Sequence, residues 1–129
     1  MKKRNIIASL VVLASIIIIA PRCSKEGDAV FIPDLGAQWT NKADATNTFF
    51  FLVAKNNVNT STFLGNENPI GGGVQFHFSG SFTNHNISFT YDNTSGVKSG
   101  LKYSGTIDNA SKVMTLSGQT LGNLVLEKQ

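Results

Sequence analysis

With 129 residues the chain has room for one domain, and its single cysteine excludes an intramolecular disulfide. The formal net charge of +3 comes from the first 22 residues, which hold 4 of the 11 Lys and Arg and none of the 8 Asp and Glu. The rest of the chain therefore carries one more negative than positive side chain, which argues against nucleic-acid binding because that function requires a basic surface.

Residues 1–22 have the pattern of a secretory signal. Lys2, Lys3 and Arg4 precede an uncharged, mostly apolar run over residues 6–20. As a helix, this run would span about 22 Å, which is shorter than the roughly 30 Å hydrocarbon core of a bilayer. Its length therefore favours a cleaved signal, with a short uncleaved anchor as the alternative.

Cys23 lies just after this segment. The residues from Ile19 to Ser24 resemble the end of a bacterial lipoprotein signal, and those from Ser24 to Asp28 resemble the acidic stretch of Bacteroidota lipoproteins displayed on the cell surface. In that family the cysteine becomes the first residue and carries a diacylglyceryl group on its sulfur. The resemblance implies that Cys23 is a lipid attachment site and that the protein is anchored at the bacterial outer membrane or cell surface. Secretion with a free Cys23 is the alternative.

The chain is thus expected to have three parts. Residues 1–22 form a lipoprotein signal peptide, residues 23–38 hold the lipidated cysteine and a tether, and residues 39–129 form the folded domain. The tether is expected because Pro33 and Gly36 would interrupt any helix between Asp28 and Gln38.

The segment from residue 39 to 129 predicts an all-β domain. It is rich in Asn, Thr, Ser, Gly and Phe, which favour strands and turns, and it shows no helical stripe. Alternation and turn residues predict about eight strands, at residues 37–42, 47–55, 58–64, 73–83, 86–92, 100–108, 112–118 and 121–127. Within the second, Thr48–Val53 is apolar on both faces, which is typical of a strand buried on both sides.

The middle strands alternate most clearly. The residues predicted to face inward on the fourth and fifth strands are Val74, Phe76, Phe78, Phe82, Ile87, Phe89 and Tyr91. A turn at Asn84–Asn86 joins these strands, since Asn tolerates positive φ. A similar Ser-Gly-strand-Asn pattern recurs about 25 residues later, and the inward positions of Gly80 and Gly105 predict bends where the sheet curls tightly.

Hairpin connections predict an antiparallel up-and-down meander, and a closed barrel is favoured over an open sandwich. Trp39 near the first strand, repeated hairpins with Asn turns, and an apolar last strand before Glu127 resemble the small lipocalin-like domains of bacterial lipoproteins. The resemblance implies a barrel whose interior binds a small hydrophobic molecule.

Several residue types that often occur in catalytic or metal sites have simpler structural explanations in this sequence. His77 is expected on a polar strand face and His85 in a turn, without further ligands at a spacing that suits zinc. Asp92 and Asp108 end strands, where turn chemistry explains a carboxylate, and Gly71–Gly73 lacks the Lys and the helix of a phosphate loop. We therefore expect no catalytic residue, metal or cofactor, and no enzyme.

Inward-facing aromatic residues are the best candidates for a binding function. The predicted ligand-binding residues are Trp39, Phe76, Phe78, Phe89, Tyr91 and Tyr103. If they line a cavity, the protein is a non-enzymatic, lipid-anchored envelope protein that binds a small hydrophobic ligand, which is the leading hypothesis. If they fill a solid core, it is an interaction module that binds envelope glycan or protein through its polar strand face or its loops.

Overall fold

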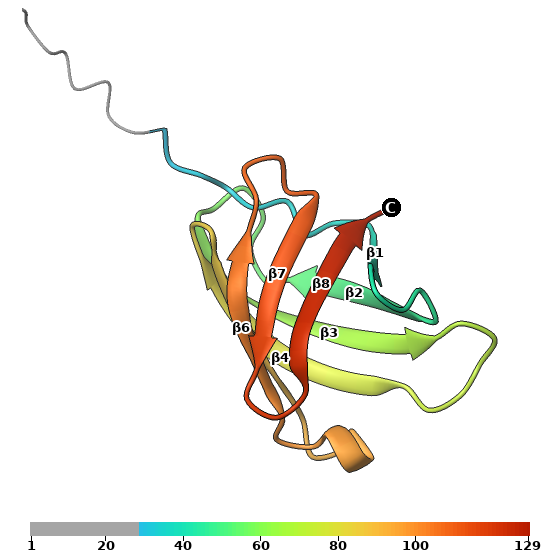
Figure 1. Cartoon of the computed structure of the whole chain (residues 1–129). Coiled ribbons are helices and arrows are strands. Elements are labelled where there is room, and N and C mark those ends of the chain that lie inside the picture. Colours follow the sequence, from blue (N-terminus) through green and yellow to red (C-terminus); the bar gives the residue numbers. More distant parts are fainter. Residues whose placement is uncertain (1–28) are drawn as a thin grey trace, which may run out of the picture.

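Eight antiparallel strands close into a barrel in the computed structural model, which describes residues 29–129 (Figure 1). In chain order the strands are β1 (Gln38–Asn41), β2 (Asn47–Val53), β3 (Thr60–Pro69), β4 (Phe76–Thr83), β5 (Asn86–Tyr91), β6 (Lys102–Ile107), β7 (Val113–Gly118) and β8 (Gly122–Lys128). Each strand pairs with the next, and β8 pairs with β1, where Trp39 lies opposite Lys128. The predicted up-and-down barrel is confirmed, and ring closure leaves no free sheet edge.

The two ends of the barrel differ in what closes them. The N-terminal segment meets the β2–β3, β4–β5 and β6–β7 connections at one end, which we call the N-terminal end (upper left in Figure 1). At the opposite end, the far end, lie the β1–β2, β3–β4, β5–β6 and β7–β8 connections. A short 3₁₀ helix, η1 (Gly96–Lys98), sits in the β5–β6 connection and is drawn at the bottom of Figure 1.

Inward residues of every strand meet in one aromatic-rich core. Strict alternation along β4 and β5 buries Phe78, Phe82, Ile87, Phe89 and Tyr91 while their neighbours face outward. Burying each large apolar side chain stabilises the fold by about 1.5–3 kcal/mol, so this stripe is a principal source of stability. The other core residues are Leu35, Trp39, Phe49, Phe51, Phe63, Tyr103, Ile107, Met114, Leu116, Leu124 and Leu126.

Gly80 and Gly105 occupy tight points of the sheet, as their inward positions predicted. A Cβ on Gly80 would overlap the carbonyl oxygen of Ser88, and one on Gly105 would overlap that of Thr115. Neighbouring strands approach so closely at these points because no side chain intervenes. The turn after β4 also matches the prediction, with Asn84 at a φ of 51°.

Three sequence-based predictions of strand structure are wrong. Val74 is exposed in the β3–β4 connection because β4 begins only at Phe76. The β2 strand is not buried on both sides, since Leu52 is 73% exposed on the outside of the barrel and pairs there with exposed Leu64. Finally, β3 extends five residues beyond the predicted end at residue 64, because polar Glu67 faces inward and finds partners there.

Part of the segment predicted as a tether belongs to the barrel instead. Leu35 is only 1% exposed and is a core residue, and its carbonyl oxygen accepts a hydrogen bond from the indole Nε1 of Trp39 at 3.2 Å. Asp34 pairs with Lys128 at 2.6 Å, and its backbone N–H donates to the Ser111 hydroxyl at 3.1 Å. These contacts close the N-terminal end of the barrel.

Candidate functional site

The six residues predicted to bind a ligand all lie in or against the core. Ring centroids of Phe78 and Phe89 are 4.4 Å apart, and those of Phe89 and Tyr103 are 5.5 Å apart. Tyr91 contacts both Phe78 and half-buried Phe76, at 5.7 and 6.4 Å. Five of the six residues therefore form one continuous cluster of rings in mutual contact.

Trp39 stands apart from this cluster. It contacts Phe51 at 6.2 Å between centroids, near the N-terminal end, and Phe51 in turn touches Phe78 and Phe89. Three hollows of about 450 to 610 Å³ among the described residues are lined by other side chains than Trp39, Phe78, Phe89, Tyr91 and Tyr103. The buried rings of Phe78, Phe89, Tyr91 and Tyr103 thus pack against one another inside the barrel.

The outer surface of β4 to β7 carries ordered rows of small polar side chains. Ser81 pairs across strands with Ser88, Ser88 with Ser104, and Ser104 with Ser117. The adjacent row is formed in the same way by Thr83, Asn86, Thr106 and Thr115. We call these eight residues the hydroxyl wall. Neighbouring members lie about 4.8 Å apart across strands and about 6.8 Å apart along them.

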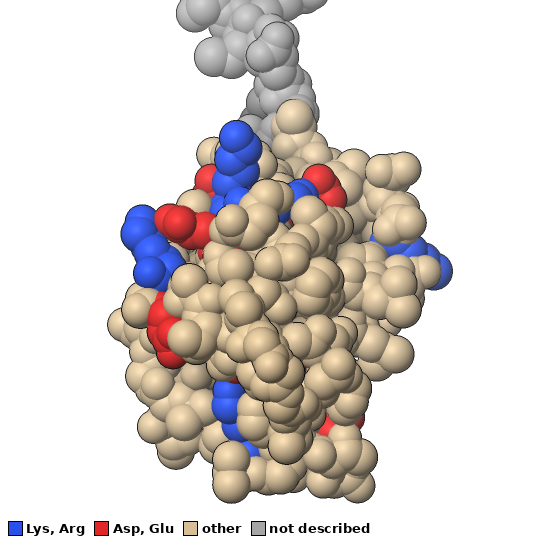
Figure 2. Space-filling model, turned by 90° about the vertical axis from the view of Figure 1, so that its right-hand side faces the viewer, with Lys and Arg blue, Asp and Glu red and all other residues tan. Residues whose placement is uncertain are grey.

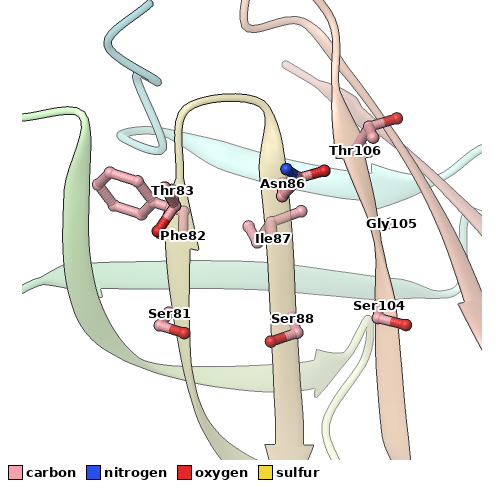
Figure 3. A pocket seen from close by; sticks show the side chains of 9 residues that line it. All are labelled: Ser81, Phe82, Thr83, Asn86, Ile87, Ser88, Ser104, Gly105 and Thr106. Atoms are coloured by element: carbon pink, nitrogen blue, oxygen red, sulfur yellow. The ribbon is translucent and has the colours of Figure 1, made fainter.

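Part of the hydroxyl wall is hollowed. A shallow depression of about 480 Å³ lies over β4, β5 and β6, where Ser81, Ser88 and Ser104 form a line across three strands (Figure 3). Gly105 lies between Ser104 and Thr106 on β6, at the inward position where β6 and β7 approach closely. The depression is lined by hydroxyl and amide groups together with Phe82 and Ile87, which are largely buried in the core.

The hydroxyl wall carries no charged side chain. On β6 the nearest charges, Lys102 and Asp108, lie at the first residue of the strand and just after its last. Figure 2 shows a different side of the molecule, the one on which β1, β2 and β3 lie in Figure 1, and most of that surface is also uncharged. Trp39, Tyr91 and Tyr103 are buried, and the two arginines of the chain precede residue 29. The hydroxyl wall therefore offers neutral hydrogen-bonding groups without Trp, Tyr or Arg side chains.

A second polar arrangement closes the far end of the barrel. The carboxylate of Glu67 on β3 is 2% exposed and accepts a hydrogen bond from the Tyr91 hydroxyl at 2.5 Å. Asn47 donates to its Oε1 at 2.6 Å, and the ammonium of Lys98 lies 2.7 and 2.6 Å from its two oxygens. Of its four residues the predictions from sequence included only Tyr91, although continuing the inward alternation from Phe63 through Gly65 would have reached Glu67.

The cluster alters the acidity of its tyrosines. Burial and the neighbouring Glu67 carboxylate raise the pKa of Tyr91 above its usual value. Burial and the charge of Glu67 also raise the pKa of Tyr103. Both phenols therefore remain neutral throughout the physiological pH range, and the Tyr91 hydroxyl can donate to Glu67.

Other residues considered from the sequence have local structural roles. The Asp92 carboxylate accepts from the Thr94 hydroxyl at 2.6 Å and the Thr94 N–H at 2.9 Å, and that of Asp108 accepts from the N–H of Val113 at 2.9 Å and of Lys112 at 2.7 Å. These bonds lower the pKa of both aspartates. His77 is exposed on β4, whereas His85 stacks on Phe31 with centroids 3.7 Å apart. Within residues 29–129 no cluster of His, Cys, Asp or Glu is arranged to hold a metal, and Gly71–Gly73 forms an exposed turn.

The predicted anchor lies outside the described residues. Cys23 and the signal segment precede residue 29, where the described chain begins. From that residue onward, no helix is long and apolar enough to cross a bilayer. Comparison of the chain with known protein families, with curated proteins and with solved structures found no match.

Proposed function

We propose that this protein is a non-enzymatic binding module of the bacterial cell envelope, tethered by lipid on Cys23, whose hydroxyl wall binds a neutral polyhydroxylated ligand such as an envelope glycan. The observation that carries the proposal is the uninterrupted alignment of serine hydroxyls across β4 to β7 on an uncharged, partly concave surface. Close ring contacts inside the barrel favour this function over binding of a hydrophobic ligand, which would have to displace side chains already packed together.

Hydroxyl and amide side chains suit a sugar because each donates and accepts hydrogen bonds. A glycan presents the same kind of group at regular intervals, and neither partner has to give up the hydration of a charge. Individual bonds of this type contribute only about 0.5–1.5 kcal/mol, so several rows acting together are needed for useful affinity. A wall of eight such residues on four strands meets that requirement.

A protein partner is a weaker fit for the same surface. The residues that contribute most of the binding free energy at protein interfaces, the hot spots, are enriched in Trp, Tyr and Arg. The hydroxyl wall has none of these, and all Trp and Tyr side chains among residues 29–129 are buried. The side chains of the hydroxyl wall therefore suit a repeating neutral polymer better than a protein partner.

Affinity electrophoresis tests the proposal directly. The protein is run in native gels that contain one of a panel of neutral polysaccharides, and at least one polymer is expected to retard it. Ser104→Lys should abolish the retardation, because it places a long charged chain in the depression. Thr120→Lys, which adds the same charge in the exposed β7–β8 turn, is the matched control and should retain it. Retardation that persists in Ser104→Lys would refute the role of the wall.

The anchor has a separate test. Cells that express the full chain are fed labelled fatty acid, and the protein is expected to incorporate the label and to fractionate with membranes. Cys23→Ser should remove both properties, because serine lacks the sulfur that would carry the diacylglyceryl group, and stable attachment requires two or more acyl chains. A wild-type protein that takes up no label would contradict lipidation without affecting the proposed ligand.

A further inference from the structure

The ammonium of Lys98 occupies a cage at the far end of the barrel. Two oxygens of the Glu67 carboxylate hold it at 2.7 and 2.6 Å, and it lies 4.6 Å from the ring centroid of Phe76 and 5.3 Å from that of Tyr91. A carboxylate combined with aromatic faces is the arrangement by which proteins recognise organic cations. The structure thus shows this site holding an ammonium group.

The strands build the cage independently of Lys98. Glu67 lies on β3, Phe76 begins β4 and Tyr91 ends β5, so the barrel itself sets their positions. The Asn47 amide and the Tyr91 hydroxyl bond to different oxygens of the carboxylate and fix its orientation. The rings of Phe76 and Tyr91 meet edge to face at 88°, which orients one against the other. Removing Lys98 would leave an oriented, buried carboxylate without a cation.

Lys98 belongs to a turn that makes few other contacts with the barrel. None of the residues of η1 is buried, and Val97 beside Lys98 is 90% exposed. The turn is bonded mainly to itself, through Lys98 N–H to the Ser95 carbonyl and Ser99 N–H to the Gly96 carbonyl. Its Lys98 ammonium is therefore the main link between η1 and the strands.

Both ends of this turn are suited to act as hinges. Gly96 and Gly100 have positive φ values of 55° and 77° and can change conformation at low cost. Outside them the chain is bonded to the strands, since the Ser95 hydroxyl donates to the His77 carbonyl at 2.6 Å and the Tyr91 N–H donates to the Leu101 carbonyl at 3.0 Å. Lys98 can thus leave the cage while the strands keep their places.

We infer that the far end of the barrel is a binding site for a ligand bearing a primary ammonium group, and that Lys98 is its built-in competitor. An amine would replace Lys98 between Glu67 and the rings of Phe76 and Tyr91, and the turn would swing outward. Because the hinge glycines lie outside the hydroxyl wall, this site is separate from the proposed glycan surface.

The test uses full-length protein and n-butylammonium as the probe. Lys98→Ala leaves the cage vacant, so its Tm should rise with n-butylammonium and saturate, because a ligand that binds only the folded state stabilises it. n-Butanol, which has the same body without the charge, should produce no saturable rise. The wild-type protein should bind n-butylammonium with an apparent affinity at least about tenfold weaker. Only the fraction of molecules in which Lys98 has left the cage can bind the probe.

Two further substitutions test whether n-butylammonium binds at the Glu67 carboxylate. Lys98→Gln, which retains a donor but no charge, serves if Lys98→Ala does not fold, and it should also gain the saturable response. Adding Glu67→Gln to either variant should weaken n-butylammonium binding by about tenfold or more, because a charge-assisted bond is lost. Absence of a saturable rise in both single variants, or equal affinity in variant and wild type, would overturn the inference.

Discussion

Lys98 and Glu67 meet at the far end of the barrel although 31 positions separate them in the chain, and the lysine ammonium touches both carboxylate oxygens, at 2.7 and 2.6 Å. The carboxylate is buried, whereas about a quarter of the lysine side chain is exposed. A buried charge of this kind is tolerated only when it is paired and hydrogen-bonded. The pair therefore joins the β5–β6 connection to β3.

Lys98→Met should destabilise the protein by about 3 kcal/mol, because it leaves the Glu67 carboxylate buried without its counter-charge. Urea denaturation at neutral pH measures the change. The double variant Lys98→Met/Glu67→Leu should recover much of the loss, since an apolar pair no longer requires solvation. If the single variant unfolds at the same urea concentration as wild type, the pair does not contribute to stability.

Stability should fall as pH rises above about 10, the pKa of tyrosine in an unfolded chain. Below that pH Tyr91 is neutral in both states. Above it the unfolded chain releases the proton while the folded protein retains it, because burial and Glu67 raise the pKa of Tyr91. The unfolded state then binds fewer protons, so the free energy of unfolding decreases with pH.

Tyr91→Phe should flatten this alkaline decline and lower stability at neutral pH by about 1.5–3 kcal/mol, the contribution of a hydrogen bond to a charged group. Denaturant titrations at about pH 8 and about pH 11 give both quantities. A variant that is as sensitive to alkali as wild type would show that Tyr91 does not control the decline.

Gly105→Ala should destabilise the barrel by about 3 kcal/mol or more, because the added methyl would overlap the Thr115 carbonyl oxygen and force β6 and β7 apart. Thr106→Ala, at an exposed position next to it, is the matched control and should change stability by less than about 0.5 kcal/mol. Thermal unfolding followed by circular dichroism compares the two. Equal Tm values would mean that strand spacing at Gly105 can relax.

Leu35→Ala should reduce the free energy of unfolding by about 2–5 kcal/mol, because Leu35 is 1% exposed and packs in the core. Ile32→Ala, three positions earlier at a side chain that is 46% exposed, should cost far less. Denaturation of both variants shows whether the N-terminal segment is an integral part of the domain. A negligible effect of Leu35→Ala would restore the interpretation of residues 31–36 as a free tether.

Sequence patterns predicted the barrel well because alternation and turn residues are local signals. The bounds of β2, β5 and β7 lie within two residues of the predicted ranges, and the Asn84 turn is where its tolerance of positive φ places it. The failures involve contacts between distant residues. From the sequence alone Leu35 resembles a linker residue, but in the fold it packs in the core beside Trp39. Glu67 likewise resembles a turn residue, but in the fold it is bonded to Lys98 and Tyr91.

The candidate surface was predictable only in part. Alternation indicates that Ser81, Ser88 and Ser104 face outward, but it does not determine which residues stand opposite one another on neighbouring strands. Register comes from the turns and from the tight packing at Gly80 and Gly105, and these bring the serines into one line. The predicted aromatic ligand site, in contrast, assumed a hollow interior that the ring contacts leave little room for.

The most direct test of the proposed function is a ¹H–¹⁵N NMR titration of the isotope-labelled protein with an oligosaccharide from the polymer that retards it in gels. The hydroxyl wall predicts saturable shifts of backbone amides on β4 to β7, centred on Ser81, Ser88 and Ser104, with β1 and β2 unchanged. Shifts centred instead on the core residues Phe78 and Phe89, or no shifts at any sugar concentration, would contradict the proposal.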